Sequence, residues 1–246
     1  MKRRKFLTTC AAALAMSASL IVVDAADAAP EAGQRAGWTS QFNGSKAGWQ
    51  NVVGNWTLRP GNLYSTGIPG KRTSVKHINN YTNFYYTVRM KRRGNSTGLA
   101  ANAVVLRGNP SSRTVEGYWR PSYLFQYANQ GYFSVFRFNP DGSFVAVKSW
   151  TTTGVVNRTG YNTVEVWVDG TFLDFHINGV HLWSGFDAGG PTFGNVGVSI
   201  FTEPGKFSET FLDSATLVID SSRRHEHASE SPGKAVAGGS VDMAPR

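Results

Sequence analysis

The feature that most limits the possible folds is a series of short segments rich in Val, Thr, Tyr, Phe and Trp, from Trp38 to about Ile219. Gly, Asn and Asp separate these segments, and no stretch keeps a helical apolar period over three turns. The clearest breaks are Asp141-Gly142, Asp169-Gly170 and Asn178-Gly179, dipeptides that tolerate the positive φ angles of tight hairpins. Short strands separated in this way predict an all-β domain, either a sandwich or a barrel.

The N-terminal segment has the three zones of an export signal. Arg3-Arg4-Lys5-Phe6-Leu7 follows the twin-arginine pattern, an apolar, alanine-rich run extends from Ala11 to Val23, and Ala26-Asp27-Ala28 is a small-residue cleavage site. The apolar run is too short for a permanent transmembrane helix. We therefore expect residues 1–28 to be a twin-arginine signal peptide, removed on export to the periplasm or the exterior, and no membrane anchor. An ordinary secretory signal with a chance arginine pair is the alternative.

Cysteine content and charge limit the remaining chain. The only cysteine, Cys10, lies inside the predicted signal, so the mature protein can form no disulfide and has no thiol nucleophile or cysteine zinc site. A chain of this length can instead build a sizeable apolar core. The full chain has a net charge of +9, and residues 1–28 hold four of its basic and two of its acidic residues, which leaves +7. This excess favours anionic partners such as acidic polysaccharides, cell-wall polymers or lipid head groups.

Composition also divides the mature chain. We expect residues 29–37 to form a short polar lead and residues 38–220 to form one folded domain. Residues 221–246 contain no aromatic side chain and are rich in Ser, Gly, Ala and Pro, so they offer little apolar surface to offset chain entropy. We predict that they form a disordered tail.

One hairpin can be predicted residue by residue. Residues 162–168 and 171–178 flank Asp169-Gly170, and with this two-residue loop Val168 lies opposite Thr171 and Glu165 lies opposite Asp174. One face is then apolar and is the predicted core face: Val164, Val166, Val168, Leu173, Phe175 and Ile177. The other face is largely polar but includes an aromatic pair: Thr163, Glu165, Trp167, Phe172, Asp174 and His176.

A second hairpin joins residues 122–127 to residues 132–138 through Ala128-Asn129-Gln130-Gly131. We expect Tyr127 to pair with Tyr132, which collects one set of side chains on a single face: Tyr123, Phe125, Tyr127, Tyr132, Ser134 and Phe136. The opposite face receives Ser122, Leu124, Gln126, Phe133, Val135 and Arg137. Neither face is cleanly polar, so both are expected to be partly covered, and the pattern leaves open which one points inward.

Several segments resemble the concanavalin A-like jelly-roll superfamily. The matching parts are the opening Trp38…Phe42…Gly48-Trp49…Gly54-Asn55-Trp56, the hairpin 162–179, Gly194-Asn195-Val196-Gly197-Val198 and the closing segment 211–217. Within the superfamily the chain most resembles bacterial secreted laminin-G-like and glucanase-like domains, including 3-keto-disaccharide hydrolases. The resemblance implies a two-sheet antiparallel jelly-roll β-sandwich whose last strand returns beside its first, with any ligand in a concave groove. Fold alone leaves the function open, because this architecture hosts lectins, glycosidases, lyases and adhesion modules.

The catalytic signature of the retaining glucanases in this superfamily, Glu-x-Asp-x-x-Glu on one strand, is absent from the sequence. The sharpest catalytic candidates are instead Glu165 and Asp174, because two adjacent carboxylates call for a bound cation, a nearby arginine or a raised pKa. His176 shares their predicted face. The alternative is a solvated face on which both carboxylates point into water.

Aromatic side chains provide the candidates for carbohydrate binding. The C–H groups of a pyranose pack on a flat ring, and a tyrosine hydroxyl can bond a sugar hydroxyl. On these grounds we select Trp119, Tyr123, Tyr127 and Tyr132, with Arg137 beside them. The alternative is that these rings belong to an aromatic-rich core.

A basic run, Arg89, Lys91, Arg92 and Arg93, follows the strand-like segment 84–88. Arg89, Lys91 and Arg93 alternate, so they share one face and could hold an anionic polymer. Export makes a glycan or wall polymer a better partner than nucleic acid, which we do not expect to bind. The alternative is a solvated edge strand whose charges prevent pairing with other chains.

The resemblance also implies a structural calcium ion between the first and last strands, and Asp213 is the candidate ligand. Taken together, the sequence predicts an exported β-sandwich that binds a polysaccharide or cell-wall glycan. Two alternatives stay open. One is a glycoside hydrolase or lyase of the same fold, acting on a glycan or modified disaccharide. The other is a structural or adhesion domain without a small ligand.

Overall fold

The computed structural model describes residues 37–96 and 98–219. The predicted signal peptide, all but the last residue of the predicted lead, and the predicted tail lie outside these residues. The described part contains fifteen β-strands, and no helix in it is long and apolar enough to cross a membrane. The strands are β1 (Gly37–Ser40), β2 (Trp49–Val53), β3 (Trp56–Arg59), β4 (Asn62–Thr66), β5 (Arg72–Tyr81), β6 (Phe84–Gly94), β7 (Ala101–Gly108), β8 (Ser122–Ala128), β9 (Tyr132–Phe138), β10 (Phe144–Thr152), β11 (Asn162–Asp169), β12 (Phe172–Ile177), β13 (Val180–Phe186), β14 (Gly194–Phe201) and β15 (Ser208–Val218).

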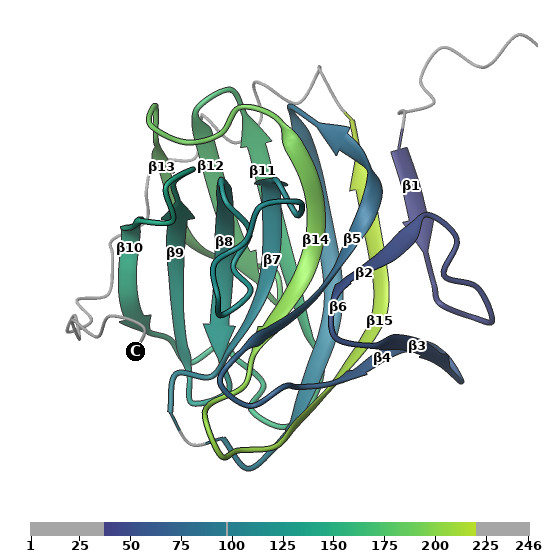
Figure 1. The fold of residues 1–246 in the computed structure, drawn as a ribbon. Helices are drawn as coiled ribbons and strands as arrows, with labels where there is room; N and C mark the ends of the chain where they lie inside the picture. Colours follow the sequence, from purple (N-terminus) through teal and green to yellow (C-terminus); the bar gives the residue numbers. More distant parts are fainter. Residues whose placement is uncertain (1–36, 97, 220–246) are drawn as a thin grey trace, which may run out of the picture. The chain divides into compact units, whose positions relative to one another are not determined.

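These strands form two antiparallel sheets that stack face to face (Figure 1). The eight-stranded sheet has the order β13-β12-β11-β6-β15-β4-β3, and β1 also pairs with β15. The seven-stranded sheet has the order β10-β9-β8-β7-β14-β5-β2. The predicted two-sheet sandwich is therefore confirmed, and the last strand lies beside the first as the resemblance implied.

The core lies between the sheets and is built from alternate residues of each strand. In β11, Val164, Val166 and Val168 are fully buried, whereas the residues between them are partly exposed. Phe125 of β8 meets Phe175 of β12 edge to face, with ring centroids 5.1 Å apart. Burial of one such side chain contributes about 1.5–3 kcal/mol. With no disulfide available, this packing is the main source of stability.

The hairpin of β11 and β12 has the predicted core face but a different register. The structure pairs Val168 with Leu173 and Glu165 with His176, so the expected pairing of Glu165 with Asp174 is wrong. The two-residue loop is Gly170-Thr171, not Asp169-Gly170, and Gly170 has a φ of +58° at the first loop position. This moves the register by two residues, which keeps every side chain on its predicted face.

The hairpin of β8 and β9 differs from its prediction by one residue. Tyr127 pairs with Phe133 and not with Tyr132, because the loop is the three-residue segment 129–131. A shift of one residue exchanges the two faces of the second strand. The face that packs into the core consequently carries Tyr123, Phe125, Tyr127, Phe133 and Val135.

The outer face of the seven-stranded sheet carries a second apolar cluster, which is covered by residues 109–121 between β7 and β8. Tyr118 stacks on Phe138 of β9, with ring centroids 4.4 Å apart. The indole N–H of Trp119 donates to Ser74 of β5 at 3.0 Å. Since β9 and β5 lie near opposite sides of this sheet, the segment spans its outer face and occupies it with the chain's own side chains.

The strand that carries the basic run lies inside its sheet. β6 pairs with β11 on one side and with β15 on the other. The alternative in which the basic residues protect a solvated edge is therefore wrong. The actual edges of the two sheets include β13 and β10.

Candidate functional site

A cleft of about 870 Å³ lies beside the edge strands β10 and β13. Its wall on one side comes from β9, β10 and the segment that follows β10, and its wall on the other side comes from β13. The lining residues are Gln130, Gly131, Tyr132, Phe133, Lys148, Thr151, Thr152, Thr153, Gly154, Val155, Arg158, Val180, His181, Leu182, Trp183 and Ser184. Because edge strands have a free side, this cleft is bounded by two unpaired strand edges.

Local irregularities shape both walls. β10 has register shifts on either side of Lys148, and β13 has one where Phe175 pairs with Trp183 and the next residue, His176, pairs with His181. Bulges of this kind bend an edge strand and re-aim its side chains. The segment after β10 is held in place, since the side-chain amide of Asn178 donates to Val155 O at 2.8 Å.

The cleft combines aromatic and polar groups. Tyr132 and Trp183 are partly exposed, and Trp183 packs against the core, with its ring centroid 6.2 Å from that of Phe125. Lys148 and Arg158 bring positive charge, while Thr151, Thr152, Thr153 and Ser184 bring hydroxyls. The lining contains no aspartate or glutamate. Such a surface can hold a neutral or anionic polar ligand, with rings that supply contact area.

Of the predicted carbohydrate-binding residues, Tyr132 lines this cleft and the other four do not. Trp119 is 2 % exposed and belongs to the segment that covers the seven-stranded sheet. Tyr127 is fully buried, and its hydroxyl donates to Met90 O at 3.3 Å. Neither ring presents a free face to a ligand in this structure.

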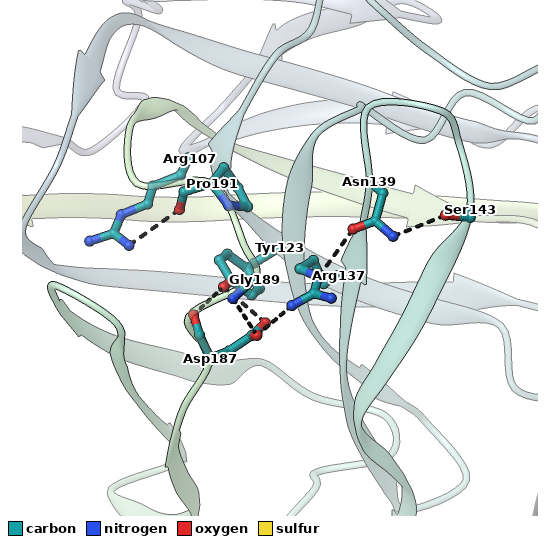
Figure 2. Close-up of polar contacts among 8 residues, drawn as sticks. All are labelled: Arg107, Tyr123, Arg137, Asn139, Ser143, Asp187, Gly189 and Pro191. Atoms are coloured by element: carbon teal, nitrogen blue, oxygen red, sulfur yellow. Dashed lines mark hydrogen bonds and ion pairs between the residues drawn. The ribbon is translucent and has the colours of Figure 1, made fainter.

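Tyr123 and Arg137 belong to a different group of polar contacts (Figure 2). The hydroxyl of Tyr123 donates to Asp187 Oδ2 at 3.0 Å, and the guanidinium of Arg137 pairs with Asp187 Oδ1. The Gly189 N–H donates to the same carboxylate at 3.1 Å. Burial, and then the Asp187 charge, raise the pKa of Tyr123. These contacts fix the chain after β13 against β8 and β9, so they support the fold around the cleft.

Arg107, also drawn in Figure 2, holds three loops together. It is 2 % exposed and donates to Thr82 O at 2.7 Å, to Gly170 O at 2.7 Å and to Pro191 O at 3.3 Å. Its φ of +47° is unusual for a residue with a side chain. Three carbonyl partners from separate loops explain why this backbone conformation is tolerated.

The two catalytic candidates lie apart from the cleft lining, on the outer face of the eight-stranded sheet. Glu165 accepts a hydrogen bond from the Tyr85 hydroxyl at 2.8 Å. Asp174 is 5 % exposed; its Oδ2 lies 3.0 Å from His176 Nε2 and its Oδ1 lies 3.2 Å from His181 Nε2. The Asp174 hydrogen bond is the main cause of a raised pKa for His176. The His181 contact connects this group to the cleft.

Asp213, the candidate calcium ligand, pairs with Arg89 at 2.8 Å. Residues 37–96 and 98–219 contain no group of three or more His, Cys, Asp or Glu side chains able to hold a metal ion. An arginine beside a carboxylate competes with a cation for the same oxygens. The calcium ion therefore remains only an implication of the resemblance.

Sequence reasoning missed most of the cleft. Trp183, His181, Lys148 and Arg158 come from two edges that are far apart in the chain and meet only because the sheets stack. The one available signal was Trp183, which lies four residues after the predicted Asn178-Gly179 turn and so on a third strand of that meander. No strand was predicted there.

The fold can be compared with known proteins. No family model matches the sequence, and no curated protein matches it. Among solved structures, carbohydrate-binding module CBM66 from Bacillus subtilis is similar, with a TM-score of 0.52 and 15% identity, over 68% of this chain and 94% of that one. The Bacillus licheniformis β-glucanase has a TM-score of 0.57 and 12% identity, over 75% of this chain and 98% of that one. A β-1,3-1,4-glucanase (lichenase) from a mouse hindgut metagenome has a TM-score of 0.57 and 10% identity, over 74% and 98%.

At these identities the likeness shows the fold alone. The architecture is an antiparallel two-sheet jelly-roll β-sandwich, the fold that the sequence resemblance implied.

The His176–Asp174 pair gives a pH-dependent contribution to stability. A raised folded pKa means that the contribution is complete below the unfolded value of 6.5 and is lost as pH rises through the folded pKa. We expect His176→Gln to lower the free energy of unfolding by about 1–2 kcal/mol near pH 5.5 and by less near pH 8.5. Urea unfolding at the two pH values measures this difference.

His77 acts in the opposite direction, so the variant must be compared with the unsubstituted protein at each pH. Burial lowers the pKa of His77 to about 4. As pH falls below 6.5, His77 therefore takes up a proton in the unfolded chain but not in the folded protein, and the free energy of unfolding decreases. An effect of His176→Gln that is equal at both pH values would contradict the proposed ion pair.

Proposed function

We propose that this protein is an exported carbohydrate-binding β-sandwich that holds a glycan in the cleft between β10 and β13. The observation that carries this proposal is the lining of the cleft, where Tyr132 and Trp183 stand among hydroxyl and basic side chains. Its volume of about 870 Å³ lies within the range of small-molecule sites. It offers room for a few sugar units.

The chemistry of the lining suits a sugar. An indole or phenol ring accepts the C–H face of a pyranose, and threonine and serine hydroxyls exchange hydrogen bonds with sugar hydroxyls. Lys148 and Arg158 add donors that favour a glycan with carboxylate or other anionic groups. The solved structures of similar fold include a carbohydrate-binding module and glucanases, which supports a glycan as the ligand class.

Binding is favoured over hydrolysis by the absence of acidic residues from the lining. Most glycoside hydrolases use two carboxylates on either side of the scissile bond, roughly 5–10 Å apart. The cleft lining provides neither of them.

One contact favours an enzyme of the same fold as a second candidate. His181 lines the cleft, and its Nε2 lies 3.2 Å from the Asp174 carboxylate. The two atoms do not form a hydrogen bond in this geometry, but a histidine beside a carboxylate can serve as a general base. Release of sugars or unsaturated products from a bound glycan, lost in His181→Gln, would favour this hydrolase or lyase over a binding protein.

Binding through Trp183 is tested by substitution. Once a glycan array identifies a ligand, we expect Trp183→Ala to weaken its binding by about tenfold or more, because a buried aromatic contact is lost. Isothermal titration calorimetry measures the affinity. Trp183→Phe keeps the apolar packing against the core and should retain partial affinity.

Trp167→Ala is the matched control, since Trp167 lies on the outer face of β11 and outside the cleft lining. The affinity of the Trp167→Ala variant for the glycan should equal that of the unsubstituted protein. Equal losses in the two tryptophan variants would contradict the site. An array without any bound glycan would favour the structural or adhesion role.

Export is part of the same proposal and rests on the twin arginine and the zones that follow it, outside the described residues. Replacement of Arg3-Arg4 with Lys-Lys should leave the uncleaved precursor inside the cell, because the twin-arginine route reads that pair. Immunoblots of cell fractions measure the distribution. Unchanged export would show that the arginine pair is incidental and that an ordinary secretory signal operates.

A further inference from the structure

A row of cations runs along the outer face of β6, in the middle of the eight-stranded sheet. Arg89, Lys91 and Arg93 occupy alternate positions and point away from the core, whereas Arg92 between them is 4 % exposed and points inward. Alternate residues of a strand lie about 6.6–6.8 Å apart, so the three charges form a closely spaced line.

Aromatic rings lie beneath these cations. Arg89 and Lys91 lie over the Tyr161 ring, at 4.3 Å and 4.4 Å from its centroid. Lys91 and Arg93 also lie over the Phe211 ring, at 5.0 Å and 5.3 Å. Each ring therefore makes cation–π contacts with two neighbouring cationic side chains, and these contacts restrict the positions of those side chains.

The row continues across the neighbouring strands. Phe211 of β15 lies beside Tyr64 of β4, with ring centroids 5.2 Å apart, and Arg59 of β3 lies over the Tyr64 ring at 3.8 Å. We call this surface the basic stripe; it consists of Arg59, Tyr64, Arg89, Lys91, Arg93, Tyr161 and Phe211.

Acidic neighbours leave much of this charge unpaired. Asp213 pairs with Arg89 at 2.8 Å. Glu209 lies opposite Arg93 in the β15–β6 register, but its carboxylate accepts a hydrogen bond from the Tyr64 hydroxyl at 2.6 Å. Among the described residues, no ion pair joins a carboxylate to Lys91 or Arg93. Lys91 and Arg93 repel each other, and Glu209 is the one carboxylate directly opposite either of them in the β15–β6 register.

No requirement of the fold explains this repulsion. Charged residues on edge strands prevent pairing with other chains, but β6 has a strand on each side. A sheet face exposed to solvent needs polar residues, yet it does not need three cations in a line over aromatic supports. The arrangement is instead suited to a ligand that carries repeated negative charges.

We propose that the basic stripe binds a linear anionic polysaccharide, at a surface separate from the cleft. Charge complementarity is the basis of recognition, with carboxylate or sulfate groups of the polymer meeting Arg59, Lys91 and Arg93. Single-stranded nucleic acid is a poorer fit, because its bases need open ring faces and the cations already cover those of Tyr161 and Phe211.

The test compares two charge reversals of equal size. The affinity for polygalacturonate at low ionic strength should fall by about threefold or more in Lys91→Glu and by about tenfold or more in K91E/R93E. Lys71→Glu, an exposed lysine before β5 in the other sheet, makes the same change in net charge and should have little effect. Neutral dextran should not compete, and added salt should weaken binding.

Further arms separate the possible outcomes. Lys91→Gln and Arg93→Gln remove charge without introducing a carboxylate, so they provide the measurement if the reversals do not fold. Dextran sulfate shows whether sulfate replaces carboxylate. Equal effects of Lys71→Glu and Lys91→Glu would overturn the proposal, as would stripe-dependent binding that is tighter to single-stranded DNA or to anionic vesicles. Lys148 and Arg158 also make the cleft positive, so K91E/R93E is measured in a Trp183→Ala background as well. The loss of polygalacturonate affinity caused by K91E/R93E should be the same in both backgrounds, and a loss that disappears with Trp183→Ala would overturn the proposal of a separate surface.

Discussion

The position of β15 is the constraint on which the rest of the structure depends. The last strand lies inside the eight-stranded sheet, where it pairs with β6 from Ser208 to Val218 and also with β4 and β1. The N-terminal strand β1 and the C-terminal strand β15 of the described chain therefore pair with each other. The eight-stranded sheet is incomplete until β15 has been added. Such long-range pairing is slow to form. It places β15 and β6 in the interior of the eight-stranded sheet, whereas β13 of this sheet and β10 of the other remain at edges.

The two candidate surfaces follow from this arrangement. The cleft lies at the edges that β15 does not close, where bulges in β10 and β13 turn Lys148 and Trp183 toward it. The basic stripe lies at the centre, where β15 brings Phe211 beside β6. The interior contributes packing, and buried polar groups such as Arg107 join loops to it. Ligand binding is thus assigned to surfaces that the core positions but does not include.

Alternation and turn residues predicted the all-β class correctly because they report local preferences, whereas the two-sheet jelly roll was implied by the family resemblance. The core face of β11 and β12 was predicted to the residue, even with the loop misplaced, since a shift of two residues preserves the faces. The β8–β9 hairpin was not, because a three-residue loop shifts the register by one. Tyr123 and Tyr127 accordingly lie in the core. Of the cleft, sequence reasoning selected only Tyr132, because the walls come from edges that meet only through stacking of the sheets.

The central claim is that a glycan binds beside Trp183, and the most direct measurement follows the indole N–H signals in nuclear magnetic resonance spectra. The chain has seven tryptophans, so each signal reports on a different part of the sandwich. Titration with a glycan that binds should shift the Trp183 signal, while Trp56 and Trp119, which are buried away from the cleft, keep theirs. Shifts centred on Trp119, or binding that leaves the Trp183 signal unmoved, would contradict the account.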